Sequence, residues 1–210
     1  MYLPRSFRED DLDSLFSLIE RYNFGTLITR SSGGLVANHY PFLVERGSGP
    51  LGTLRAHLAL ANPQLQDLKA GAEVLVTFMG PHGYVSPAWY TEEKAVPTWN
   101  YAAVHAWGIP HLITEPEPLM ALMAALVRQH EAPRAEPWVL VPEDLWTRGL
   151  LKNIVGFEIG ISRIEGKLKL SQNRPESSQL GVIEALSGST SHLDQELATL
   201  MVETRQRRKV

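Results

Sequence analysis

The 210-residue chain contains no cysteine. This absence excludes disulfide bonds, thiolate nucleophiles and cysteine-based metal sites. No apolar run approaches the roughly 20 residues that a membrane-spanning helix needs. The opening segment MYLPRSFREDD carries a proline and several charges but no apolar stretch, so it does not resemble a secretory signal. These absences predict a soluble, cytoplasmic protein.

Several sequence motifs of catalysis and nucleotide binding are also missing. There is no GxxxxGK[ST] phosphate-binding loop and no GxSxG nucleophile elbow. The histidines show no HExxH or i,i+4 spacing, so we expect no helical zinc site. The net charge of −3 does not favour polyanion binding through bulk charge.

Hydrophobic periodicity predicts alternating strands and helices. Residues Asp10–Asn23 have helical spacing, and two β-rich runs flanking SSGG predict a hairpin of Phe24–Arg30 with Leu35–Glu45. A strand over Leu51–Leu60 and a short helix from Asn62, as N-cap, to Gly71 follow. The later expected elements are strands at 73–80, 82–86 and 98–114 (bent near 108–110), helices at 116–131 and 142–153, a strand pair turning at Gly166, and two terminal helices.

Tight turns between the early strands favour antiparallel pairing. We therefore expect an α+β fold, a mostly antiparallel small barrel or curled sheet with helices packed outside it. At 210 residues the chain has the size of one domain.

The stretch PTWNYAAVHAWG separates into two faces when it is read as a strand. One face is small and suits a tight barrel interior: Thr98, Asn100, Ala102, Val104, Ala106 and Gly108. The other is large and aromatic: Trp99, Tyr101, Ala103, His105 and Trp107. The large face suits either packing beneath outer helices or a site for a flat ligand, and the residues alone favour packing.

Two other strands carry polar donors on one face. Arg55 and His57 alternate with leucines and alanine and precede the helix start at Asn62, so they suit an anion site or an exposed edge. His39 lies on the neighbouring strand. Lys167 and Lys169 share a face of KLKLSQN, which is typical of a solvated surface or of a phosphate clamp. The basic tail residues Arg205, Arg207, Arg208 and Lys209 have no helix-turn-helix pattern beside them.

The ordered motifs VANHYPF, HLALANPQ, VSPAWY, VPTWNYAAVHAWG, LKNIVGFEI, GKLKLSQNRP and GVIEAL resemble the PaiB-like family of FMN-binding negative transcriptional regulators. The resemblance covers nearly the whole chain. It implies a split β-barrel with peripheral helices, similar to pyridoxamine-phosphate oxidases, over residues 1–175. Residues 176–210 are then a helical extension packed on the barrel. It also implies a homodimer that holds flavin in a groove between its subunits.

When the family's motifs are matched one by one to this sequence, the resemblance implies a cofactor site that contains no metal. It does not identify a catalytic residue. The sequence departs from the family at Leu60, where relatives carry an arginine before the ANP motif, and at Ala56, where glycine is common. Arg55 is the candidate replacement for that arginine. The implied cofactor-binding residues are His39, Arg55, His57, Asn62, Ser86, Trp89, Tyr90, Thr98, Trp99, Asn100, Tyr101, His105, Lys169, Ser171, Gln172 and Arg174.

Three functions fit this resemblance. The first is a transcriptional regulator or flavin-dependent sensor, in which the acidic net charge leaves direct DNA contact without support. The second is a flavin-dependent oxidoreductase using NAD(P)H. The third is a haem-binding or haem-degrading protein, with His39 or His105 as the axial ligand. Whether the chain is an enzyme stays open.

Overall fold

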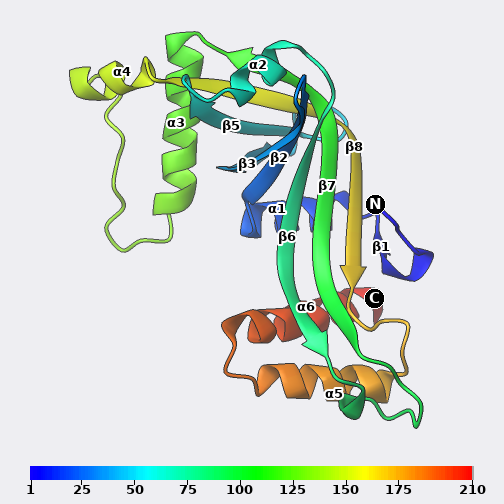
Figure 1. The fold of residues 1–210 in the computed structure, drawn as a ribbon. Helices are drawn as coiled ribbons and strands as arrows, with labels where there is room; N and C mark the ends of the chain where they lie inside the picture. The colour runs from blue at the N-terminus through cyan, green and yellow to red at the C-terminus, as the bar shows by residue number, and fades with distance from the viewer. Residues whose placement is uncertain (210) are drawn as a thin grey trace. The chain divides into compact units, whose positions relative to one another are not determined.

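The computed structural model describes residues 1–209, with side chains as far as Arg208. The chain forms two compact units, each assembled from separate segments (Figure 1). The first unit comprises Met1–Leu15, Met79–Val104 and the chain from Glu165 onward, and the second comprises Phe16–Phe78 and His105–Ile164. The boundary predicted at residue 175 stays a prediction.

Helices and strands alternate along the chain much as the periodicity indicated. The helices are α1 (Leu12–Arg21), α2 (Gln64–Lys69), α3 (Pro116–Glu131), α4 (Leu145–Leu151), α5 (Glu176–Ser187) and α6 (His192–Lys209), with 3-10 turns η1 (Arg5–Phe7) and η2 (Pro87–Trp89). The strands are β1 (Arg8–Glu9), β2 (Phe24–Ser31), β3 (Gly34–Pro41), β4 (Leu43–Glu45), β5 (Thr53–Ala59), β6 (Val74–Val85), β7 (Thr98–Ile113) and β8 (Ile154–Lys169).

The strands of the described chain form one sheet in the order β3-β2-β6-β7-β8-β5-β4, with β1 added to β8. In the second unit the two edge strands, β3 and β4, are separated only by Phe42. A sheet whose edges are joined by one residue has to curl back on itself, which gives a barrel. The α+β split-barrel prediction is confirmed.

Phe42 fills the interior of this barrel. Its ring packs edge-on against Phe78 at a centroid distance of 5.5 Å and against Phe157 at 6.1 Å. All three side chains are essentially inaccessible to solvent. Burying three aromatic rings in one cluster stabilises the closed sheet, since each contributes a large apolar area.

The predicted hairpin is confirmed in its register, with Thr26 opposite His39 and Ser31 opposite Gly34. The short helix α2 also starts as expected, because the Asn62 Oδ1 atom accepts a hydrogen bond from the backbone N–H of Gln64. This contact satisfies one of the donors that a helix start leaves open.

The strand pair expected around Gly166 is wrong: β8 is one continuous strand of 16 residues. Gly166 pairs with Glu9 of β1, and a Cβ atom at this position would collide with the Leu15 side chain. The glycine therefore serves close packing rather than a turn. The strand expected over 98–114 is not interrupted at 108–110, since β7 runs on to Ile113 and Gly108 makes room there for the backbone of Gly160.

The two runs expected at 73–80 and 82–86 form the single strand β6.

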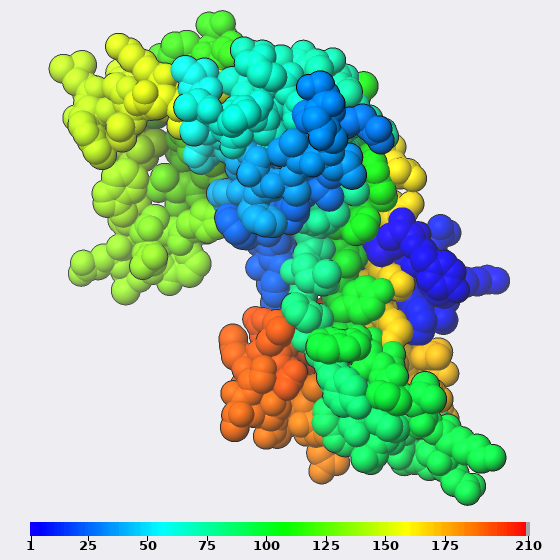
Figure 2. Space-filling model, viewed as in Figure 1, coloured from blue at the N-terminus to red at the C-terminus, as the bar shows by residue number. Residues whose placement is uncertain are grey.

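In the first unit, α5 and α6 lie side by side (Figure 1). Gly181 of α5 lies directly against the carbonyl of Trp89. The α3–α4 connector of the second unit, yellow-green in Figure 2, lies at the surface. None of the helices in the described chain is long and apolar enough to span a membrane.

Candidate functional site

Most of the predicted site residues belong to the first unit, and several of them gather around two lysines of β8. Lys169 Nζ donates hydrogen bonds to Thr98 Oγ1 at 2.6 Å and to the Trp99 carbonyl oxygen at 2.5 Å. Lys167 Nζ lies 5.3 Å from the centre of the Tyr101 ring. We refer to Lys167, Lys169, Thr98, Trp99 and Tyr101 as the lysine–aromatic cluster.

The two lysines carry positive charge, on a buried side chain at Lys167 and on a partly buried one at Lys169. Lys167 is 7% exposed and donates to the backbone carbonyl of Tyr2, and neither ammonium has a carboxylate partner among the described residues. Burial lowers the pKa of Lys169, and the charges of Lys167 and Arg174 lower it further. A buried cation beside a partly buried one, with no carboxylate partner for either, is costly, and an anion binding here reduces that cost.

An exposed aromatic surface adjoins these cations. Trp99 of β7 is 55% exposed, and its ring lies 6.3 Å from that of Tyr84 and 6.5 Å from that of His82, both on β6. Exposed aromatic rings beside positive charge suit a ligand that combines a flat ring with an anionic group.

Three other predicted residues of the first unit form a buried polar network. Asn100 is fully buried, and its Nδ2 atom donates to Ser171 Oγ at 2.9 Å. The Tyr90 hydroxyl lies 3.4 Å from the same Ser171 oxygen. Ser171 adopts a left-handed conformation with φ of 63°, which a non-glycine residue takes up only at some cost. The hydrogen bonds observed for Asn100, Tyr90 and Ser171 join these residues to one another, so the role that the structure shows for them is structural.

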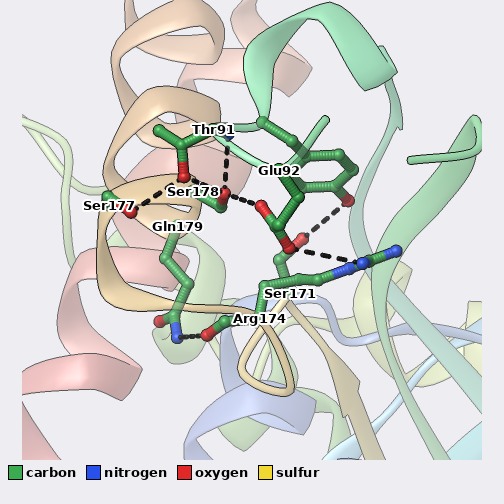
Figure 3. A network of polar contacts seen from close by, with 8 residues as sticks. Thr91, Glu92, Ser171, Arg174, Ser177, Ser178 and Gln179 are labelled. Atoms are coloured by element: carbon green, nitrogen blue, oxygen red, sulfur yellow. Dashed lines mark hydrogen bonds and ion pairs between the residues drawn. The ribbon is translucent and has the colours of Figure 1, made fainter. Parts of the chain in front are cut away.

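Arg174 is fixed by a second network that reaches helix α5 (Figure 3). Its Nη1 atom pairs with Glu92 Oε1 at 3.3 Å, and its guanidinium group lies 4.9 Å from the centre of the Tyr90 ring. Glu92 also accepts a hydrogen bond from Ser178 Oγ, which is the largest cause of its lowered pKa. Thr91 N donates to Ser178 Oγ at 2.8 Å.

Two of the remaining predicted residues of the first unit, Ser86 and Gln172, form hydrogen bonds with the backbone. Ser86 Oγ accepts from the Ala88 N–H at the start of η2, which contains Trp89. Gln172 Oε1 accepts from the backbone N–H of Leu170, at the end of β8. These side chains hold the loops on either side of the lysine–aromatic cluster.

In the second unit, Arg55 is held by two carboxylates. Its Nη1 atom lies 2.5 Å from Glu45 Oε1, and its Nη2 atom lies 3.0 Å from Glu158 Oε2. These two carboxylates neutralise the charge that Arg55 would offer to a phosphate group. Leu60, where the resemblance implies an arginine, is 52% exposed.

The histidines of the second unit have separate surroundings. His57 lies opposite Gly156 on β8, its Nδ1 atom is buried without a hydrogen-bond partner, and burial lowers its pKa. His39 is exposed, with Nδ1 2.9 Å from Thr26 Oγ1. His105 packs against Trp107 at a centroid distance of 5.7 Å.

The predicted residue Asn62 also lies in the second unit. It donates a hydrogen bond to the Tyr40 hydroxyl in addition to its contact with Gln64.

The basic tail is largely occupied by contacts within the first unit. Arg205 pairs with Glu176 at 2.5 Å and donates to Gln179 at 2.8 Å. Arg207 lies 3.8 Å from Glu9 and donates to Ser14. The Lys209 side chain lies outside the described residues. No group of three or more potential metal ligands occurs in the described part of the chain.

Three residues were not among the predicted set: Lys167, Glu92 and Ser178. Lys167 was signalled by its alternation with Lys169. Glu92 and Ser178 meet across a sequence separation of 86 residues, and no local pattern announces such a contact.

A family model described as "Putative FMN-binding domain" matches residues 1–163. The chain is 34% identical over 204 residues to the "Protease synthase and sporulation protein PAI 2" of Bacillus subtilis, with 96% of each chain covered. Among solved structures, it is similar to an FAD and haem binding protein from Mycobacterium smegmatis (TM-score 0.58, 20% identity, 77% of this chain and 73% of that one). It is also similar to a flavocytochrome from Azotobacter vinelandii (TM-score 0.59, 12% identity, 79% and 72%). At these identities the two structures show a shared fold.

Proposed function

The chain belongs to the PaiB-like family of FMN-binding split-barrel domains, and we propose that it binds FMN through the lysine–aromatic cluster. The observation that carries this proposal is the pair Lys167, which is buried, and Lys169, which is partly buried; neither has a carboxylate partner in the described chain. FMN joins a doubly charged phosphate to a flat ring system, and the cluster offers cations beside exposed aromatic rings.

Each residue of the cluster has a distinct role in this proposal. Lys167 and Lys169 neutralise the phosphate, and the Thr98 hydroxyl holds the Lys169 head in place. Trp99 provides an apolar surface for the ring. The bound flavin supplies redox chemistry, whereas the chain binds and orients it and keeps water from one face.

We further propose a homodimer with the cofactor groove at its interface. Support comes from three large apolar side chains exposed in the first unit, Met79, Tyr84 and Trp99. Isolated exposed apolar residues are ordinary, but neighbouring aromatic ones are typical of interfaces. Sedimentation velocity is expected to give a dimer, and a monomer at every concentration would count against this part of the proposal.

The biological role that we propose is regulation of transcription by a flavin-dependent sensor in the cytoplasm. The name of the Bacillus relative, which refers to protease synthesis and sporulation, supports a regulatory role. Arg205 and Arg207 are engaged within the unit, so they do not favour DNA contact through the tail. We therefore propose that regulation acts through a partner protein. In gel-shift titrations the chain alone should show only weak, salt-sensitive binding. Sequence-specific binding that persists at high salt would contradict this route.

A flavin-dependent oxidoreductase is the second candidate, and the exposed ring pair of Tyr84 and Trp99 favours it, because a nicotinamide ring needs a stacking surface. Stopped-flow mixing of the FMN-loaded protein with NADPH separates the two functions. Rapid bleaching of flavin absorbance supports the enzyme, and no bleaching supports the sensor.

Haem binding is the third candidate. A Soret band that appears on haem titration and is lost in His39→Ala or His105→Ala would support it.

A further inference from the structure

A cavity of about 620 Å³ in the second unit is lined by none of the residues of the lysine–aromatic cluster. One wall is formed by α3 and carries the small or apolar side chains Pro118, Ala121, Leu122 and Ala125. The sheet side contributes Leu43, Glu45, Arg55 and Glu158, and residues 112–115 close one end. This volume is within the range of small-molecule sites.

The polar groups of this cavity carry an excess negative charge. Arg55 is shared by Glu45 and Glu158, so the three side chains sum to −1. Arg55 contacts only one oxygen of each carboxylate, Glu45 Oε1 and Glu158 Oε2. The second oxygen of each carboxylate has no hydrogen-bond donor in the described chain. Glu115 adds a further negative charge to the lining.

The negative charge of this cavity, together with its apolar wall, indicates which class of ligand it can bind. The carboxylates of Glu45 and Glu158 are about one-third to two-fifths exposed, at 43% and 35%, and the wall facing them is apolar. A charge next to an apolar wall is stabilised by an opposite charge that also donates hydrogen bonds. A hydrated metal ion does not suit the apolar wall, and no group of three potential metal ligands exists among the described residues.

We propose that this cavity binds a small organic monocation, an alkyl- or arylalkyl-ammonium compound. Its ammonium group donates to the free oxygens of Glu45 and Glu158, and its apolar body packs against Leu43, Leu122 and the alanines of α3. Binding brings the Glu45–Arg55–Glu158 group to zero net charge. This inference goes beyond the proposed FMN function and does not depend on it.

Isothermal titration calorimetry with phenethylamine, 2-phenylethanol and 3-phenylpropionate tests the proposal on the full chain. The three probes share a ring and differ in charge. The amine should bind saturably, the alcohol at least about tenfold more weakly, which is 1.4 kcal/mol, and the carboxylate more weakly still. Equal binding of amine and alcohol, preference for the carboxylate, or no saturable binding of the amine would overturn the proposal.

Two variants and one control variant test where the amine binds. Glu158→Gln brings the Glu45–Arg55–Glu158 group to zero net charge and should weaken amine binding at least about tenfold. Ala121→Trp fills the cavity from the exposed face of α3 and should abolish amine binding while FMN affinity is unchanged. Ala124→Trp places the same side chain on the same helix outside the lining residues, and amine affinity should stay at the wild-type value. Undiminished binding by Ala121→Trp would overturn the assignment to this cavity. A protein that binds the amine but not FMN would refute only the proposed function.

Discussion

Lys169 donates a 2.6 Å hydrogen bond to the hydroxyl of Thr98, and this contact joins the two most specific motifs of the chain. Lys169 belongs to KLSQNR on β8, and Thr98 opens PTWNY on β7. The same ammonium group reaches the Trp99 carbonyl at 2.5 Å. The ammonium group at the end of β8 is therefore tied to the start of β7, to the backbone of a residue whose side chain is 55% exposed.

Replacing Lys169 should weaken FMN binding. Lys169→Gln removes a charged hydrogen-bond donor, and such bonds contribute about 1.5–3 kcal/mol, so the dissociation constant should rise about 10- to 100-fold. Quenching of flavin fluorescence measures this change. Lys69→Gln, on the exposed last turn of α2, is the matched control and should bind like wild type. An unchanged affinity in Lys169→Gln would remove the lysine from the site.

Replacing Trp99 should give a different pattern. Trp99→Ala removes contact with the ring but leaves both lysines in place, so the affinities for FMN and for riboflavin should fall by the same factor. Titration of the variant with both flavins measures the two ratios. A loss confined to FMN would place Trp99 at the phosphate instead of the ring.

The buried Asn100–Ser171 pair should respond to substitution as a unit. Asn100→Ala leaves Ser171 without its main partner and should lower the free energy of unfolding by about 1–3 kcal/mol. Ser171→Ala should destabilise the protein for the same reason. Because the two side chains share their hydrogen bonds, the double variant should lose less than the sum of the single losses. Urea unfolding of all four proteins tests this, and strict additivity would show that the contact contributes nothing.

Stability should fall at mildly acidic pH because of His57. Burial lowers its pKa below the usual 6.5, so below that value the unfolded chain binds a proton that the folded chain does not. The contribution of neutral His57 is therefore complete above about pH 6.5 and is lost as pH falls through the lowered folded pKa. For one proton the slope is at most about 1.4 kcal/mol per pH unit.

The variant His57→Phe should lose less stability than wild type between about pH 7.5 and about pH 5.5 in urea unfolding. If it does not fold, His57→Gln serves the same purpose. His192→Phe is the control, since the His192 side chain is 86% exposed, and it should keep the wild-type pH dependence. An identical pH dependence in wild type and His57→Phe would contradict the assignment.

The sequence was sufficient for the fold class and for most element types. Alternation in PTWNYAAVHAWG correctly separated a buried small face, in which Asn100, Ala102, Val104 and Ala106 are fully inaccessible, from a larger, partly exposed one. The prediction of a turn at Gly166 was wrong, because a glycine that makes room for the Leu15 side chain and a glycine in a turn look alike in sequence. Local pattern carries no information on which distant element approaches a residue.

The same limit applies to the predicted site. Lys169 and Arg55 were equivalent candidates in sequence, each a cation on an alternating strand. The structure separates them by their partners, since Arg55 is held by Glu45 and Glu158 whereas Lys169 contacts only a hydroxyl, a carbonyl and an aromatic ring. Both carboxylates come from other strands, and Glu158 is more than one hundred residues away along the chain.

Parallel fluorescence titrations of the wild-type protein with FMN and riboflavin test the central claim most directly, because the two flavins differ only in the phosphate. If Lys167 and Lys169 hold the phosphate, FMN binds at least about tenfold more tightly than riboflavin, and Lys169→Gln reduces that ratio toward one. Equal affinity for the two flavins, or failure to bind FMN at all, would contradict the assignment of the lysine–aromatic cluster as an FMN site.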